Sequence, residues 1–414
     1  MAGSAPSDSG GFGGAVPRRI LPVIVLSQFA GTSLWFAVNA VMPDLQQAWG
    51  LPAGAVGTLT SAVQLGFVAG TLVFAFLMLA DRFAPSRVFL VCSLLGAALN
   101  AATVWAQGDL TVLLALRFCV GFFLAGIYPV GMKIAASWYR ERLGVVMGVL
   151  IGALVLGTAL PHGLRALAGD AGRAVFAGGG APWQAVVLGV SLLATLGGLA
   201  TAWLVPESPY VVRGVRITPR ALGLIWSDRR LRASVLGYFG HMWELYAFFV
   251  LVPLILATRL AGTSVSTAAF WVIAAGSLGC IGGGLLVRRF GSARVAQLQL
   301  AISGACCVAA PMMLDAPLPL FMAWMLLWGT TVSGDSPQFS TLTAQNAPPA
   351  VAGSVLTFAN CIGFAISVLS IEIFVSAAQA WPLSAVLPWL ALGPALGLWM
   401  IRPLLPQAQL NRRQ

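Results

Sequence analysis

Long apolar runs separated by short polar connections recur along the whole chain of 414 residues. Each run has about 20 residues or more, the length that a helix needs to cross a hydrocarbon core of about 30 Å. The pattern predicts an all-α membrane protein with twelve transmembrane helices in two pseudo-symmetric six-helix bundles. The predicted spans are residues 20–42, 54–80, 87–106, 110–138, 143–165, 184–205, 233–257, 264–287, 293–313, 318–341, 351–377 and 382–404.

Arginine residues gather in alternate connections. The arginines of one set of connections lie at residues 18–19, 82–87, 140–142, 213–232, 288–294 and 402–413. The connections on the other side of the predicted membrane contain only Arg165, Arg173 and Arg259. Basic residues accumulate on the cytoplasmic side of membrane proteins, so we expect both termini to be cytoplasmic. The expected organisation is a disordered segment 1–19, a first bundle 20–205, a basic linker 206–232, a second bundle 233–404 and a tail 405–414. The run 20–42 is too long for a signal peptide and is followed at once by further spans, which favours an uncleaved first helix.

The two predicted bundles share a repeated pattern of glycine and proline. The first set of matches, at an offset of 208 residues (329 − 121 = 208), consists of Gly121 with Gly329, Gly126 with Gly334 and Pro129 with Pro337. A second match, at an offset of 210 residues (239 − 29 = 210), joins Phe29 in the first span to Phe239 in the seventh. A duplication explains both matches, and parallel six-span halves place a substrate site between them near mid-membrane.

Composition excludes several other classes of protein. The chain is 59% hydrophobic and 8% charged, with a mean hydropathy of +0.90, whereas soluble domains are about 25% charged. The net charge of +11 does not indicate a nucleic-acid-binding protein, because the arginines lie between apolar runs and not in one basic domain. The six cysteines lie inside apolar runs without a CxxC motif or zinc spacing. We expect no metal, no cofactor and no nucleic-acid partner, and a monomer in the lipid bilayer.

Three motifs resemble signatures of the major facilitator superfamily. Asp81 and Arg82 follow the second span in a degenerate copy of the signature G-x-x-x-D-R-x-G-R, and Arg288 and Arg289 occupy the corresponding place in a second copy. Arg117 begins the fourth-span signature R-x-x-x-G-x-x-x-x-G. The resemblance covers all twelve spans and implies the twelve-helix fold of that family. It also implies that the two cytoplasmic motifs act in conformational change and that Arg117 is tied to proton coupling.

The direction of transport stays open at this point. Span five departs from the family's antiporter signature, because Leu160 stands before Pro161 where the signature has glycine. This departure weakens an exporter interpretation. The phrase GIYPVGMKIAASWYRER resembles the fourth span of branches that import anions, although the signature of true nitrate porters is absent.

Arg117 and Lys133 are the candidate anion-binding residues in the fourth span. Tyr128 lies eleven residues after Arg117, close to three helical turns, so we expect both on one helix face. Lys133 is the one lysine among 23 basic residues. The alternatives are an arginine that only bonds helix carbonyls, and a lysine that reaches the cytoplasmic interface.

His241, Glu244 and Tyr246 form a polar cluster in the seventh span. His241 and Glu244 are three residues apart and therefore adjacent on one helix face. Burial disfavours the charged form of a carboxyl group, so Glu244 can bind and release a proton within a transport cycle. The alternative is a satisfied polar pair that fixes helix packing.

Asp335 and Gln338 lie beside Pro337 in the tenth span. A helix broken by proline is tolerated at membrane depth where it lines a cavity, so we expect these side chains to face one. Glu372 lies near the outer end of the eleventh span, where it can simply reach water. The candidate cavity-wall residues, each of which can instead be an interhelical hydrogen-bonding group, are Trp35, Asn39, Gln64 and Asn360.

These features predict a proton-coupled secondary transporter in a bacterial cytoplasmic membrane that imports a small organic or inorganic anion by alternating access. We expect Arg117, Glu244 and Asp335 to face a water-filled chamber between the halves. The alternatives are proton-driven efflux of drugs or amphipathic metabolites, and a membrane sensor that binds its ligand without transport. Copper transport is disfavoured, because M-x-x-x-M and H-x-x-x-M pairs are absent from spans seven and eight. No nucleotide-binding loop or nucleophile–base pair supports an enzyme.

Overall fold

The computed structural model describes residues 16–139, 143–175, 182–210 and 218–405, which form helices joined by short connections. The first half contains α1 (Ile20–Thr32), η1 (Ser33–Phe36), α2 (Ala37–Trp49), α3 (Ala55–Phe76), α4 (Leu79–Arg82), α5 (Pro85–Ala102), η2 (Thr103–Trp105), α6 (Leu110–Leu124), α7 (Tyr128–Trp138), α8 (Leu143–Val175) and α9 (Pro182–Leu204). The second half contains α10 (Arg220–Ser227), α11 (Arg229–Ala257), α12 (Thr263–Phe290), α13 (Ser292–Met313), α14 (Leu318–Gly334), α15 (Ser336–Asn346), α16 (Ala352–Ala380), α17 (Leu383–Val386), η3 (Leu387–Ala391), α18 (Leu392–Met400) and η4 (Arg402–Leu404).

Eleven helical segments within the described residues are long and apolar enough to cross a membrane. The remaining crossing of the predicted twelve is divided between α14 and α15, which are separated by Asp335 alone. Pro337 stands in the first turn of α15, where a missing backbone N–H costs little. The fourth span is also divided, because α6 ends at Leu124 and α7 begins at Tyr128. The repeated glycine and proline pattern thus corresponds to a helix break in each half.

Several predicted boundaries are wrong. The fifth span does not end at residue 165, because α8 continues through Pro161 to Val175. The linker 206–232 is partly helical, since it contains α10 and the first turn of α11. Helix α11 begins at Arg229 and not at residue 233, because the Asp228 carboxylate accepts a hydrogen bond from Leu231 N at 2.7 Å and caps the helix. The predicted segments 1–19 and 405–414 lie largely outside the described residues.

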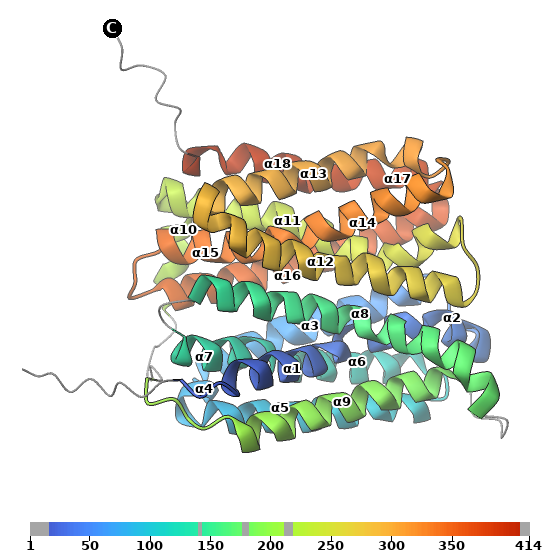
Figure 1. The fold of residues 1–414 in the computed structure, drawn as a ribbon, viewed down its shortest axis with the longest axis horizontal. Coiled ribbons are helices and arrows are strands. Elements are labelled where there is room, and N and C mark those ends of the chain that lie inside the picture. Colours follow the sequence, from blue (N-terminus) through green and yellow to red (C-terminus); the bar gives the residue numbers. More distant parts are fainter. Residues whose placement is uncertain (1–15, 140–142, 176–181, 211–217, 406–414) are drawn as a thin grey trace, which may run out of the picture.

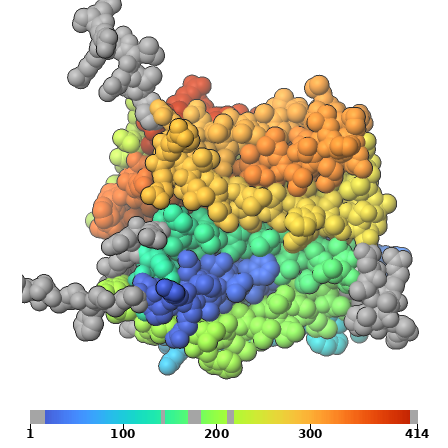
Figure 2. All heavy atoms as spheres, in the orientation of Figure 1, coloured from blue at the N-terminus to red at the C-terminus, as the bar shows by residue number. Residues whose placement is uncertain are grey.

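The two halves lie side by side, with α8 packed along α12 at the seam between them (Figure 1). Helices α3 and α16 make a second contact between the halves. On the face drawn in Figure 2, the side chains of α8 and α12 meet along this seam. The halves therefore touch mainly through these two helix pairs, which is the arrangement expected for bundles that rock against each other.

One end of the molecule carries α4, α10 and the end of α15, together with both ends of the described chain (Figure 1). We call it the arginine-rich end, because Arg18, Arg82 and Arg288 belong to it. The opposite end carries α2, α17 and the connection between α11 and α12.

The repeated glycines mark equivalent close contacts in the two halves. A Cβ atom on Gly121 of α6 would lie 2.0 Å from Val63 O of α3. A Cβ atom on Gly329 of α14 would lie 2.0 Å from Val272 O of α12. Both distances are far shorter than a van der Waals contact, so only glycine fits at either position. The sequence repeat therefore has a packing cause, since each half needs one helix backbone against another at this point.

Candidate functional site

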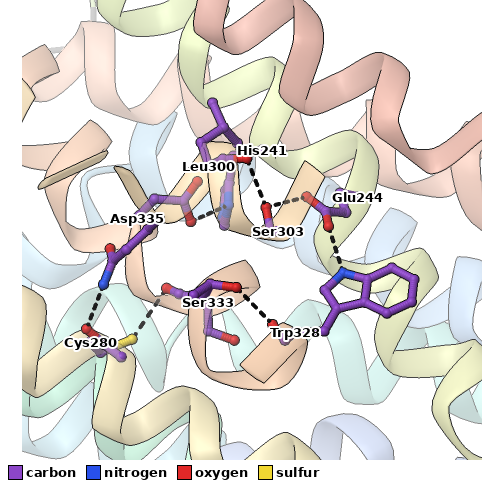
Figure 3. A network of polar contacts seen from close by, with 11 residues as sticks. His241, Glu244, Cys280, Leu300, Ser303, Trp328, Ser333 and Asp335 are labelled. Atoms are coloured by element: carbon purple, nitrogen blue, oxygen red, sulfur yellow. Dashed lines mark hydrogen bonds and ion pairs between the residues drawn. The ribbon is translucent and has the colours of Figure 1, made fainter. Parts of the chain in front are cut away.

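Asp335 occupies the gap between α14 and α15 and is fully buried. Its Oδ1 atom lies 2.8 Å from His241 Nδ1 on α11, an ion-pair distance, although the direction departs from a straight N–H···O line (Figure 3). Asp335 Oδ2 and His241 Nε2 have no hydrogen-bond partner among the described residues. The pair therefore retains hydrogen-bonding capacity that the protein itself does not use.

Glu244, one turn further along α11, accepts hydrogen bonds from three neutral donors, two of which, Ser303 and Trp328, are labelled in Figure 3. These are Trp328 Nε1 at 2.7 Å, Ser303 Oγ at 3.0 Å and Cys307 Sγ at 3.2 Å. The Ser303 hydroxyl also lies 3.2 Å from Leu300 O. A hydroxyl has one hydrogen to donate and can accept a second bond. When Glu244 is ionised, Ser303 donates to the carboxylate, and when Glu244 is protonated, the Ser303 oxygen can accept a hydrogen bond from the carboxylic O–H while its own hydroxyl donates to Leu300 O.

Arg117 is fully buried in the first half. Its guanidinium donates to Trp35 O at 2.5 Å, Leu34 O at 3.1 Å and Asn100 Oδ1 at 3.1 Å. These acceptors are neutral, no described carboxylate lies within ion-pair distance, and Nε has no partner. Burial of a charge is costly unless it is paired. Arg117 therefore holds a positive charge that described protein groups do not neutralise.

Aromatic rings from both halves meet beside Arg117. The Trp35 ring lies 4.8 Å from Phe67 of the first half, and 5.8 Å from Tyr246 and 5.4 Å from Phe364 of the second half. Trp35 Nε1 donates to Gln64 Oε1 at 3.2 Å, which fixes the ring. We call Trp35, Phe67, Tyr246 and Phe364 the aromatic cluster. Its rings fill the space between the halves where the sequence predicted an open chamber.

Lys133 is engaged by another part of the first half. Its Nζ atom lies 2.5 Å from Asp81 Oδ1 and 2.9 Å from Ala80 O. The pair joins α7 to α4 at the arginine-rich end, and both side chains are partly exposed. Lys133 thus neutralises Asp81, which follows the second span, and does not face the aromatic cluster.

The opposite end of the seam is closed by Arg165 of α8. Its guanidinium donates to Asp44 of α2 at 2.8 and 3.2 Å, and to Ser266 Oγ of α12 at 3.2 Å. The bond to Ser266 crosses between the halves. Sequence reasoning missed this contact because it placed Arg165 in a connection.

A cavity of about 570 Å³ lies at the arginine-rich end, between α8, α12 and α15. Of the predicted site residues, Gln338 and Arg288 belong to its walls, whereas Arg117, Glu244 and Asp335 do not. The expectation that these three groups face an open chamber therefore does not hold in this conformation. Each is enclosed by protein groups.

The other predicted residues are distributed as follows. Tyr128 does not share a continuous helix with Arg117, because the chain breaks between α6 and α7, but its ring stacks on Phe67 at 6.2 Å. Asn39 donates to Thr60 Oγ1 at 2.6 Å. Asn360 is half-buried on α16. Arg289 lies over the ring of the neighbouring Phe290.

Sequence reasoning missed several partners of the site. Trp328, Ser303 and Cys307 bind Glu244, and Asn100 binds Arg117. Each of these four residues is polar or amphipathic and lies within an apolar run, which is the signal that could have identified it. The described residues contain no cluster of three or more potential metal ligands, so the structure offers no metal site to test.

Comparison with known proteins agrees with this architecture. A family model described as Major Facilitator Superfamily matches residues 24–371. The chain belongs to this superfamily. It is therefore a multi-pass membrane transport protein, and proteins of this family are transporters, not enzymes. The proton:xylose symporter XylE has the same fold, with a TM-score of 0.71 at 13% identity over 93% of this chain and 95% of that one.

Three curated relatives show how widely related transporters differ. A probable transporter, SCO4007 of Streptomyces coelicolor, is 25% identical over 70% of this chain and 66% of its own length. A chloramphenicol resistance protein of Streptomyces lividans is 28% identical over 84% of this chain and 86% of its own. The 4-hydroxybenzoate transporter PcaK of Pseudomonas aeruginosa is 28% identical over 32% of each chain. This chain thus spans just under two thirds of SCO4007 and about a third of PcaK.

Proposed function

We propose that this member of the superfamily is a proton-coupled importer of a small organic or inorganic anion, with an aromatic carboxylate as the best supported substrate. It would work by alternating access in a bacterial cytoplasmic membrane, with both termini in the cytoplasm, as the distribution of arginine indicates. Protons would drive uptake.

The observation that carries the proposal is the environment of Arg117. A buried guanidinium with only neutral acceptors and an unpartnered Nε–H favours a bound anion that supplies the missing negative charge. The carbonyl that Arg117 binds most closely belongs to Trp35, whose ring is part of the aromatic cluster. A carboxylate bound at Arg117 would therefore place an attached ring among aromatic side chains of both halves.

Glu244, His241 and Asp335 are the proposed proton carriers. All three are buried in the second half, and Ser303 offers Glu244 a partner in both protonation states. A carboxyl group that is satisfied in both states can change its protonation without unsatisfied buried groups. The relatives that transport 4-hydroxybenzoate or confer chloramphenicol resistance act on aromatic compounds by their names, which agrees with an aromatic substrate.

Efflux remains a second candidate, because the chloramphenicol resistance protein matches most of this chain. Deletion of the gene would make cells sensitive to chloramphenicol if the protein exports it. Deletion would instead limit growth on an aromatic acid if the protein imports it. A sensor would bind its ligand saturably in the purified protein and produce no flux.

The test is uptake into proteoliposomes under an imposed pH gradient. A thermal-shift screen first identifies ligands among 4-hydroxybenzoate, other aromatic and aliphatic acids, inorganic anions and chloramphenicol. Wild-type protein should accumulate the ligand inside the vesicles when the outside is more acidic than the inside. Glu244→Gln should lose gradient-driven accumulation, and full accumulation by this variant would remove Glu244 from the proton pathway.

A further inference from the structure

The cavity at the arginine-rich end approaches the buried His241–Asp335 pair from one side. Gly144 and Val145 at the start of α8 and Arg288 near the end of α12 belong to its walls and are exposed. Its buried walls include Pro337 and Gln338 of α15 and Ser292 of α13. The cavity therefore extends inward from the arginine-rich end to the first turn of α15.

Asp335 lies one helical turn beyond that buried wall. The Gln338 backbone N–H donates to Asp335 O at 3.0 Å, so the two residues lie at the start and the end of one helical turn. Three residues of a helix advance about 4.5 Å along its axis. Gln338 thus belongs both to the buried cavity wall and to the helical turn that begins at Asp335.

The hydrogen-bonding groups on this path are incompletely used by the protein. Gln338 is 2% exposed, and its Nε2 has no hydrogen-bond partner among the described residues. Asp335 Oδ2 also has none. A buried amide donates and accepts, so Gln338 can join a carboxyl group to water that enters through the exposed mouth of the cavity, where Arg288 supplies a polar group.

The charges around the path favour release of a proton toward the cavity. His241 of α11 faces Asp335, Glu244 lies one turn further along α11, and Arg288 stands at the mouth. A positive charge at the mouth favours the deprotonated carboxylate, because it stabilises negative charge inside. Glu244 acts in the opposite sense, since a second carboxylate nearby favours proton retention.

We propose that this cavity is the route by which Asp335 exchanges its proton with the cytoplasm, and that Gln338 controls the rate of that exchange. The role of Gln338 in controlling proton exchange rests on the proposed proton-coupled function. The existence of an aqueous route to Gln338 is a separate physical claim that needs no substrate.

The first experiment tests the route in full-length protein. Gln338→Cys is treated with a membrane-impermeant methanethiosulfonate reagent in inside-out and right-side-out vesicles. We expect modification from the cytoplasmic face at least about tenfold faster than the wild-type background, because thiol reactivity follows access to water. An anionic reagent should react faster than a cationic one, owing to Arg288. Equal reaction from both faces, or none from the cytoplasmic face, would overturn the proposal.

Gln28→Cys is the matched control. Gln28 of α1 is also a buried glutamine, but it lies in the first half and does not belong to the cavity wall. It should react no faster than the wild-type background. Rapid modification of this control would mean that the region is generally open, and the specific route would be rejected.

The second experiment separates proton release from the other steps. In proteoliposomes that carry the screened ligand, Gln338→Leu should slow net gradient-driven uptake by about tenfold, the lower range of general acid–base effects. Exchange of labelled for unlabelled ligand should stay within about twofold, because exchange needs no deprotonation. Equal slowing of both would make Gln338 merely structural. A wild-type protein without any pH-gradient dependence would instead reject the proposed function.

Discussion

The two halves of the molecule share a backbone plan and differ in charge. Each has a broken helix, between α6 and α7 or between α14 and α15, and each has a glycine pressed against a neighbouring carbonyl. The first half buries one arginine with neutral partners only. The second half buries two carboxylates and a histidine in the same interior. Where the first half has Arg117, the second has Met325, also fully buried.

The difference indicates a division of labour. Under the proposed function, the cation of the first half would attract the anion and the carboxylates of the second half would bind protons. The aromatic cluster contains rings from both halves, so a ligand bound there would contact both. Coupling would then require no direct contact between Arg117 and Glu244.

The largest expected effect comes from making the halves alike. Arg117→Met should reduce uptake of an anionic ligand by at least about 100-fold, because a buried charge-assisted contact of about 3 kcal/mol is lost. It should also lower the free energy of unfolding by about 1–3 kcal/mol, since Leu34 O and Trp35 O lose their donor. Proteoliposome uptake measures the loss of transport, and thermal unfolding measures the loss of stability. Met325→Leu is the control and should change neither. Normal uptake by Arg117→Met would contradict an anion site at this residue.

A smaller effect is expected from Asp335→Asn. Removal of the carboxylate takes away the acidic partner of His241 and removes one proposed proton carrier. Gradient-driven accumulation should fall by about tenfold or more, while ligand exchange persists. The exposed Asp315→Asn serves as a control with the same chemistry at the surface. Loss of exchange along with accumulation would show that Asp335 supports folding or ligand binding instead.

A change of a few-fold is expected from Ser303→Ala. Glu244 keeps Trp328 and Cys307 as donors but loses the hydroxyl that can serve both protonation states. The loss of one hydrogen bond should cost about 1 kcal/mol of unfolding free energy and slow accumulation by a corresponding factor of about 5. Ser303→Thr should restore the rate, because it returns the hydroxyl. Failure of threonine to rescue, with the fold intact, would argue against this role of the hydroxyl.

The smallest effect is expected from Lys133→Met, the second cation of the first half. The partly exposed pair with Asp81 should contribute at most about 1 kcal/mol, and less at high salt. Uptake should stay within about twofold of wild type, measured beside Arg117→Met. Asp81→Asn should have a similar effect, and the double variant should add little. A loss as large as that of Arg117→Met would assign substrate contact to Lys133.

Hydropathy predicted the spans because membrane crossing depends on length and apolarity, both of which are local properties. The breaks at Pro129 and Pro337 were also visible locally. The end of α8 was not, because hydropathy marks where an apolar run ends and not where a helix ends. The contact between Arg165 and Asp44 was also hidden, since the two residues are 121 positions apart in the chain.

Partner choice within the site was harder to predict. His241 and Glu244 are adjacent on α11, yet His241 contacts Asp335 of another helix and Glu244 contacts α13 and α14. A single sequence fixes which residues share a helix face but not which helix lies opposite. For the same reason the sequence singled out Arg117 and Lys133 together, although the first has only neutral partners and the second has an aspartate.

Gly121 and Gly329 also have a consequence for mutational tolerance. At each, the addition of a single methyl group would force a backbone carbonyl aside, whereas most lipid-facing positions accept almost any apolar residue. In a saturation library selected for surface expression, these two codons should be among the least permissive, and alanine should be rejected almost as strongly as tryptophan. Neutral drift would then reshape the outer surfaces freely while the two narrowest helix crossings stay unchanged.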